Sequence, residues 1–178
     1  GAVMLKMGLY GVYKLVFPIV PAGVEHWQTT VIVLALIGAV YGGVIAFRQS
    51  DFKRLVAFSS LSHVGVLCAG LFAWNTYGIS GSFYQAFAHA ILVLGMLYLV
   101  GAMQERTGTT DMGAMGGLKG HAPRLAALFL LVLVNAVALP LTQSFVGEWL
   151  MFAGLWQVSG WLTLFALTTI VIGAIYML

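Results

Sequence analysis

Long apolar stretches, separated by short polar connections, alternate along the whole chain. A helix needs about 20 residues to cross about 30 Å of hydrocarbon, because it rises about 1.5 Å per residue. Six stretches approach or exceed this length, at residues 1–17, 27–47, 52–74, 79–103, 124–158 and 161–178. The pattern predicts an all-α fold, a polytopic transmembrane helix bundle of about six spans that forms a single transmembrane domain over residues 1–178.

Prolines mark one predicted helix end and one predicted break. Pro18 and Pro21 are expected to close the first helix, since proline lacks the N–H that continues a helix. The stretch 124–158 is too long for one straight span and contains Pro140. We expect two half-helices there, an arrangement that transporters use at ion sites. An ordinary proline kink is the alternative.

Both ends of the sequence lie inside apolar segments. Gly1 opens an apolar run without a charged leader or a cleavage site, and the last stretch stops at Leu178 without a flanking charge. We therefore expect the chain to be a fragment of a longer protein.

The composition indicates a protein whose solvent is lipid. Hydrophobic residues make up 61% of the chain and charged residues 7%, against about 25% charged residues in soluble domains. The net charge of +3 does not indicate nucleic-acid binding, because the basic residues are spread between apolar spans. Cys68 is the only cysteine, which excludes a disulfide framework. No cofactor signature for haem, flavin, an iron-sulfur cluster or a nucleotide is present in this chain.

The positive charges of the connections fall on one side of the predicted bundle. Arg48 and Lys53 flank the turn between the second and third spans, and Arg106 and Lys119 lie in the long loop 104–123. The connections on the opposite side carry no Lys or Arg. By the positive-inside rule, the Arg48/Lys53 and Arg106/Lys119 loops are expected to be cytoplasmic.

Four ionisable residues lie inside the apolar stretches: Lys6, His63, His89 and Glu148. Such a group costs from about 3 to more than 10 kcal/mol at the bilayer centre, so it normally faces a partner or a wet cavity. All four fall near the middle of their spans, and histidine titrates near pH 6.5, close to neutrality. Groups at one depth form a lateral polar axis in the membrane plane, so we interpret them as a proton relay.

Polar residues accompany each of these groups. Tyr10, Ser59, Gln85 and Ser144 each lie four residues from one of them, which places each pair on one helix face, and Ser62 precedes His63. Their side chains are expected to hydrogen-bond the titrating groups or to hold water beside them.

Two structural alternatives stay open for these buried groups. Each histidine is equally suited to an interhelical hydrogen bond that only stabilises packing. Lys6 and Glu148 are also compatible with a buried ion pair between helices. In that case the protein would be a purely structural membrane subunit.

Several motifs resemble those of a known family, the antiporter-like membrane subunits of respiratory complex I. They are Leu5-Lys-Met-Gly-Leu-Tyr-Gly11, Asp51-Phe-Lys-Arg-Leu-Val-Ala-Phe-Ser-Ser-Leu-Ser-His-Val-Gly65, Gln85-Ala-Phe-Ala-His89, Gln104-Glu-Arg-Thr107 and Phe145-Val-Gly-Glu-Trp149. The resemblance runs nearly from end to end. Glu rather than Lys at position 148 makes the chain similar to the M (chain 4) branch of that family more than to the L (chain 5) branch.

The resemblance implies a role for each buried group. Lys6 would be a central-axis lysine, His63 and His89 would continue the axis, and Glu148 on the broken helix would end it near a neighbouring subunit. Subunits of this family contain two inverted repeats, and this chain would hold most or all of the second inverted repeat of the antiporter-like fold.

The function that the resemblance implies is that of a proton-translocating membrane-arm subunit of NADH:quinone oxidoreductase. NADH, FMN, iron-sulfur clusters and quinone are expected in partner subunits, which would perform the redox chemistry of the enzyme. Other membrane subunits of complex I, including paralogous antiporter-like subunits, are the expected protein partners, in the bacterial inner (plasma) membrane. A D-type subunit of a multisubunit Na+/H+ antiporter and a membrane subunit of a membrane-bound hydrogenase are the alternatives.

Overall fold

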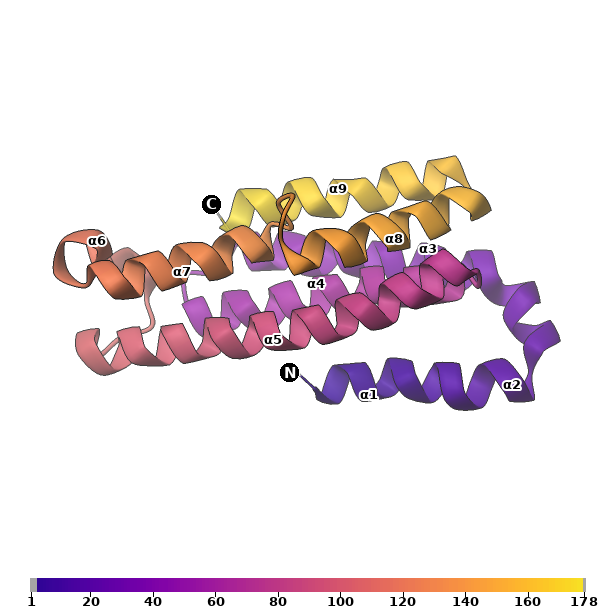
Figure 1. Cartoon of the computed structure of the whole chain (residues 1–178), viewed down its shortest axis with the longest axis horizontal. Coiled ribbons are helices and arrows are strands. Elements are labelled where there is room, and N and C mark those ends of the chain that lie inside the picture. The colour runs from indigo at the N-terminus through magenta and orange to yellow at the C-terminus, as the bar shows by residue number, and fades with distance from the viewer. Residues whose placement is uncertain (1–2, 178) are drawn as a thin grey trace.

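The computed structural model describes residues 3–177, which form a bundle of helices that run side by side (Figure 1). The all-α prediction is confirmed. The elements are α1 (Met4–Gly11), the π-helical turn η1 (Val12–Val16), α2 (Phe17–Ile19), α3 (Pro21–Phe47), α4 (Phe52–Phe72), α5 (Thr76–Thr107), the 3-10 turn η2 (Met112–Ala114), α6 (Leu118–His121), α7 (Pro123–Ala136), α8 (Gln143–Val158) and α9 (Gly160–Met177).

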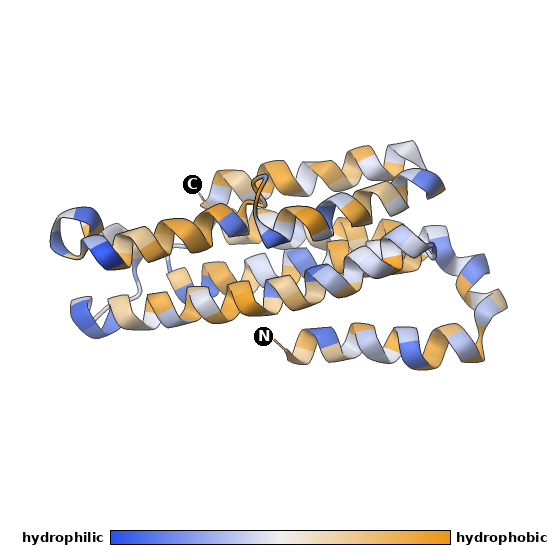
Figure 2. Ribbon diagram, in the orientation of Figure 1, coloured by the Kyte–Doolittle hydropathy of each residue, from blue (hydrophilic) through white to orange (hydrophobic). Residues whose placement is uncertain are grey.

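The lengths and composition of the helices fit a membrane. Among the described residues, α3, α4, α5 and α9 are each long and apolar enough to cross a bilayer unaided. The first predicted span is the run α1, η1 and α2, and the fifth is divided between α7 and α8. Figure 2 shows hydrophobic residues along most of the long helices and hydrophilic residues gathered where α5, α6 and α7 meet. The protein is therefore an integral membrane helix bundle.

The prediction that Pro18 and Pro21 close the first helix is wrong in its detail. The helical run continues through Pro18 to Ile19, and α3 already begins at Pro21 rather than near Trp27. A proline ring clashes with the carbonyl four residues earlier, and the wider turn η1 accommodates it just before Pro18. Pro21 stands at the first position of α3, where the missing N–H has no intrahelical partner to lose.

The predicted break at Pro140 is confirmed. The helix α7 ends at Ala136, α8 begins at Gln143, and Ala138 and Leu141 between them adopt left-handed backbone angles with φ of 51° and 80°. The two half-helices are fastened to each other, because the Ser144 amide donates to the Asn135 side-chain oxygen at 3.2 Å. The break is therefore a defined feature of the backbone.

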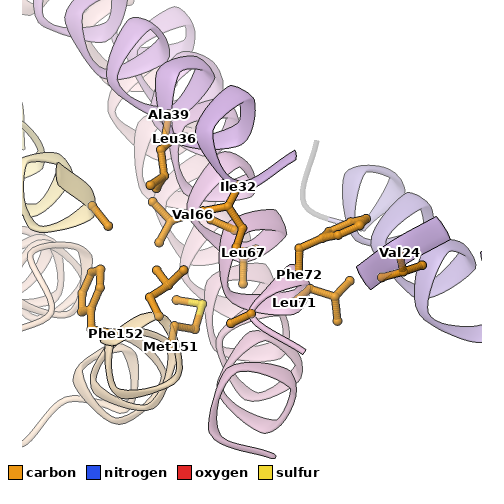
Figure 3. Packing of buried hydrophobic residues seen from close by; sticks show 14 of the residues in the cluster. Val24, Ile32, Leu36, Ala39, Val66, Leu67, Leu71, Phe72, Met151 and Phe152 are labelled. Atoms are coloured by element: carbon orange, nitrogen blue, oxygen red, sulfur yellow. The ribbon is translucent and has the colours of Figure 1, made fainter. Parts of the chain in front are cut away.

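The central helix of the bundle is α4, which contacts α3, α5, α8 and α9. In Figure 3, Ile32 and Leu36 of α3 face Val66 and Leu67 of α4, and Met151 of α8 approaches the same cluster. All five side chains are buried. Ser59, Ser60 and Ser62 in the middle of α4 are buried by these neighbours, whereas Lys53 and Arg54 at its start are exposed.

Glycines let α8 pack directly against α5. A Cβ atom on Gly81 would lie 2.7 Å from the backbone nitrogen of Met151, and one on Gly147 would lie 2.7 Å from the Cβ of Gln85. Neither position has room for a side chain, which is typical of closely packed membrane helices. The residue after Gly147 is Glu148, so this contact places the carboxylate against α5.

The two charged connections predicted on one side do lie at the same end of the bundle, called here the loop end (residues 48–54 and 104–124). Asp51 caps α4 by accepting the Arg54 amide at 2.9 Å, and it also accepts the Thr110 hydroxyl. Lys53 Nζ donates to the Gln104 side-chain oxygen at 2.6 Å. The hydrogen bonds from Thr110 and then from the Arg54 amide hold the pKa of Asp51 below its ordinary value.

Candidate functional site

Glu148 is buried between α8, α5 and α4, with 7% of its surface exposed. Gln85 Nε2 of α5 donates to its Oε1 at 3.5 Å, and His63 Nδ1 of α4 lies 3.8 Å from the same oxygen. No other ion pair is recorded in the part of the chain that the structure describes. The predicted acidic group therefore has a titratable partner on a neighbouring helix.

The second predicted histidine continues this contact. The ring centroids of His63 and His89 are 4.7 Å apart, and the rings are tilted by 46°. His89 is 1% exposed, and its Nδ1 has no hydrogen-bond partner among residues 3–177. Glu148, His63 and His89 thus form one continuous series of titratable side chains from three helices, which we call the relay triad.

Lys6 lies beside the relay triad without a recorded hydrogen bond or ion pair to it. Its buried Nζ has no hydrogen-bond partner among the described residues. It faces a groove of about 560 Å³ between α1 and α5, lined also by Ser82, Ala86 and Ala90. The structure therefore brings three of the four predicted groups into contact and leaves the lysine as a neighbouring charge.

Of the predicted supporting residues, Gln85 hydrogen-bonds a member of the relay triad, and Ser144 is buried one helical turn before Glu148. Gln85 was expected beside His89 on its own helix but donates across to Glu148. Ser144 is 1% exposed, and its hydroxyl has no hydrogen-bond partner among the described residues. Spacing along one helix does not reveal such contacts between helices.

The other supporting residues bond elsewhere. The Ser59 oxygen accepts the hydroxyl of Tyr176 on α9 at 3.0 Å, and no hydrogen bond joins it to His63. Ser62 donates to the carbonyl of Ala39 at 2.7 Å and so fastens α4 to α3. Tyr10 is 50% exposed at the edge of the groove that contains Lys6. None of the three hydrogen-bonds a titrating group directly, and their expected role in holding water beside these groups stays a prediction.

A small cavity borders the contact between His63 and Glu148. It has a volume of about 20 Å³, and its polar walls include Ser62, Thr169 and Tyr176. A single water needs roughly 10–15 Å³ measured in this way, together with polar neighbours. The cavity is therefore large enough for one water beside the 3.8 Å gap between the imidazole and the carboxylate.

The contribution of α9 to this site was not predicted from the sequence. Thr169 and Tyr176 lie in a stretch that reads as uniformly apolar. A tyrosine near the end of a span is typical of the membrane interface, so Tyr176 gave no signal of a buried role. A count of hydroxyl groups within predicted spans would have been the available signal.

Comparisons with known proteins identify the family. The family described as NADH:quinone oxidoreductase/Mrp antiporter, transmembrane, matches residues 1–173. NADH-quinone oxidoreductase subunit M of Rhodobacter capsulatus is 37% identical over 177 residues, which are 99% of this chain and 35% of that protein.

Solved structures agree with this match. A chain of respiratory complex I from Thermus thermophilus with bound NADH superposes with a TM-score of 0.93 at 35% identity, over 97% of this chain and 37% of that chain. A chain of the Mrp complex from Dietzia superposes with a TM-score of 0.79 at 25% identity, over 85% of this chain and 17% of that one.

The relatives are much longer than this chain, which spans about a third of the length of the subunit M relative. The match nevertheless includes α1, the break between α7 and α8, and all three members of the relay triad. The chain therefore belongs to the transmembrane family shared by NADH:quinone oxidoreductase and the Mrp antiporters.

Proposed function

We propose that this chain is the relay-bearing part of a proton-translocating membrane-arm subunit of NADH:quinone oxidoreductase. The observation that carries the proposal is the relay triad, in which a buried carboxylate, a half-buried imidazole and a buried imidazole from three helices follow one another within 3.8 Å and 4.7 Å. Subunit M as the name of a relative and complex I as a structural match support the assignment of the complex.

The relay triad would move protons laterally within the membrane. A proton on His89 passes to the free ring nitrogen of His63, so that one N–H bond breaks as another forms. His63 then releases a proton to Glu148, directly or through one water in the adjoining cavity. Gln85 holds the carboxylate oxygen toward the imidazole. The net result is the transfer of one proton along the membrane plane without any redox change in this chain.

Lys6 would control when the relay triad is loaded. A positive charge on Lys6 disfavours a second positive charge on either nearby imidazole, and a neutral Lys6 removes that repulsion. Moving one charge against 100 mV requires about 2.3 kcal/mol. The energy would come from NADH oxidation and quinone reduction in partner subunits, which carry NADH, FMN, iron-sulfur clusters and quinone.

The membrane placement follows from the charged loops. The loop end carries Arg48, Lys53, Arg106 and Lys119 and would face the cytoplasm of a bacterium whose inner membrane holds the complex. The chain would act as a single transmembrane domain that corresponds to the second inverted repeat of the longer subunit, in contact with other membrane subunits and with paralogous antiporter-like subunits.

A second candidate is a subunit of an Mrp-type antiporter, and the match to the Mrp complex from Dietzia favours it. The same relay triad would then exchange ions in response to a gradient rather than to NADH oxidation. A host membrane with no NADH-driven proton uptake would support this candidate.

The test is Glu148→Gln in the full-length protein, which removes the titratable group and keeps its size. NADH oxidation and NADH-driven proton uptake are measured in inverted membrane vesicles and normalised to assembled complex. The proposal predicts loss of both activities in an assembled complex. Glu105→Gln is the matched control, because Glu105 is exposed at the end of α5. Normal activity of Glu148→Gln would favour a purely structural role for the buried charges.

A further inference from the structure

Tyr176 lines two cavities and has no part in the relay described above. It lies near the end of α9, and its hydroxyl donates to the Ser59 oxygen of α4 at 3.0 Å. Its ring borders the small cavity that also touches His63 and Glu148. The tyrosine therefore stands next to the relay triad without belonging to it.

Tyr176 also lines a second, much larger cleft. This cleft has a volume of about 750 Å³ and lies at the loop end, between α4, α5, α7 and the segment around α6. Its walls are mainly apolar, and Lys119 contributes a charged group to them. Among the residues that the structure describes, Tyr176 alone borders both the loop-end cleft and the small cavity. Tyr176 is therefore part of the wall of the cleft and part of the wall of the space beside the buried carboxylate.

The hydrogen bond to Ser59 shows at which level of the bundle the Tyr176 hydroxyl lies. Ser59 lies one helical turn from His63 toward the loop end, a rise of about 6 Å along α4. The Tyr176 hydroxyl is therefore held at a level between the loop end and the relay triad. In this structure the hydroxyl is held by Ser59 of α4.

We propose that Tyr176 is a gating residue that passes protons between the loop-end cleft and the Glu148–His63 pair. The proposal rests on the proposed relay function and adds to it an entrance from the loop end. The tyrosine oxygen accepts a proton from the cleft side while its own hydroxyl proton leaves to a water in the small cavity. One O–H bond forms and one breaks on the same oxygen, so the tyrosine keeps its charge. The Ser59 hydrogen bond holds the closed position.

A structural role for the hydroxyl makes a different prediction. If the bond to Ser59 only joined α9 to α4, its loss would reduce the amount of assembled complex and leave transport per complex unchanged. Tyr176→Phe separates the two roles, because it keeps the ring as a wall and removes the group that transfers the proton.

The first experiment measures NADH-driven proton uptake in inverted vesicles that carry full-length Tyr176→Phe, normalised to assembled complex. The gating role predicts a loss of at least about tenfold, since a positioned proton-transfer group contributes about 10²–10⁴-fold. Tyr98→Phe is the control, because Tyr98 is 77% exposed on α5. Wild-type uptake per complex in Tyr176→Phe would overturn the proposal.

The second experiment tests the wall itself and does not depend on pumping. Ser62, which lines the small cavity, is replaced by cysteine in a Cys68→Ala background, and a small methanethiosulfonate reagent is added from the loop end. Adding Tyr176→Ala is expected to raise the labelling rate of the new thiol several-fold, whereas adding Tyr98→Ala leaves it unchanged. An unchanged rate in the Tyr176→Ala protein would show that the ring is not the barrier and would overturn the proposal, whether or not the complex pumps.

Discussion

Two polar regions of the molecule differ in how fully their hydrogen bonds are formed. At the loop end, Asp51 accepts the Arg54 amide and the Thr110 hydroxyl, and Lys53 donates to Gln104. Charged and polar groups there are paired with one another, close to water. These hydrogen bonds join the two connections to each other.

The membrane-spanning region contrasts with this arrangement. Within residues 3–177, five buried side-chain atoms lack a hydrogen-bond partner: Lys6 Nζ, Ser60 Oγ, Gln85 Oε1, His89 Nδ1 and Ser144 Oγ. Buried polar groups are normally paired, because an unpaired one costs about 1–3 kcal/mol. The difference teaches that polar groups at the loop end hold the connections together, whereas several polar groups among the membrane-spanning helices have no partner among the described residues.

The largest effect that sharpens this comparison is expected at His89. His89→Gln keeps a polar side chain of similar size but cannot carry a proton between neutral and charged forms. Proton translocation per assembled complex should fall at least about tenfold, since proton transfer by a positioned side chain contributes about 10²–10⁴-fold. Translocation is measured as NADH-driven uptake in inverted vesicles.

The matched control is His26→Gln, because His26 is exposed near the start of α3, where its ring makes an edge contact with Trp27. It should leave uptake unchanged. Equal uptake in the His89→Gln and wild-type complexes would remove the distinction between the two polar regions.

A smaller and different effect is expected at the loop end. Asp51→Ala removes the cap of α4 and the acceptor for Thr110. The amount of assembled complex and its midpoint of heat inactivation should fall slightly, while proton uptake per assembled complex stays the same. A strong loss of uptake per complex would mean that the loop end takes part in transport.

The smallest effect is the pH dependence of that loss. Hydrogen bonding lowers the pKa of Asp51 in the folded protein, against about 3.9 in an unfolded chain. A group with a lowered folded pKa stabilises the protein above its unfolded pKa, and the stabilisation disappears as the pH falls through the folded pKa. The difference in heat inactivation between wild type and Asp51→Ala should therefore be constant near neutral pH and shrink below about pH 4. A difference that grew on acidification would contradict this assignment.

The sequence was sufficient for the class of fold and for the titratable residues. Glu148, His63 and His89 could be found because an ionisable group in an apolar span is costly and therefore conspicuous. Pro140 predicted the break between α7 and α8 because a proline ring clashes with the carbonyl four residues earlier and so kinks or breaks a helix. These inferences used only the chemistry of single residues in their spans.

Contacts between helices could not be predicted in the same way. Periodicity does not say which glycines meet another helix, so the contact that Gly147 makes with α5 was not expected. The position of a residue along its helix predicts its depth in the membrane but not its distance from residues on other helices. Lys6 has the predicted depth, yet its side chain lines a groove between α1 and α5 and forms no hydrogen bond with the relay triad. The sequence indicates that Tyr176 is an interfacial residue. Its hydrogen bond to Ser59 is visible only in the structure, where α9 packs against α4.

The central claim is that His63 and Glu148 act in one proton path, and a double-mutant cycle tests it most directly. Proton uptake per assembled complex is measured for His63→Gln, for Glu148→Gln and for the double variant. Residues in contact that act as a unit show strongly non-additive effects. If the two residues act in one path, proton uptake per complex in the double variant should be no lower than in the less active of the two single variants. Losses that multiply in the double variant would show that the two residues act independently and would contradict the account.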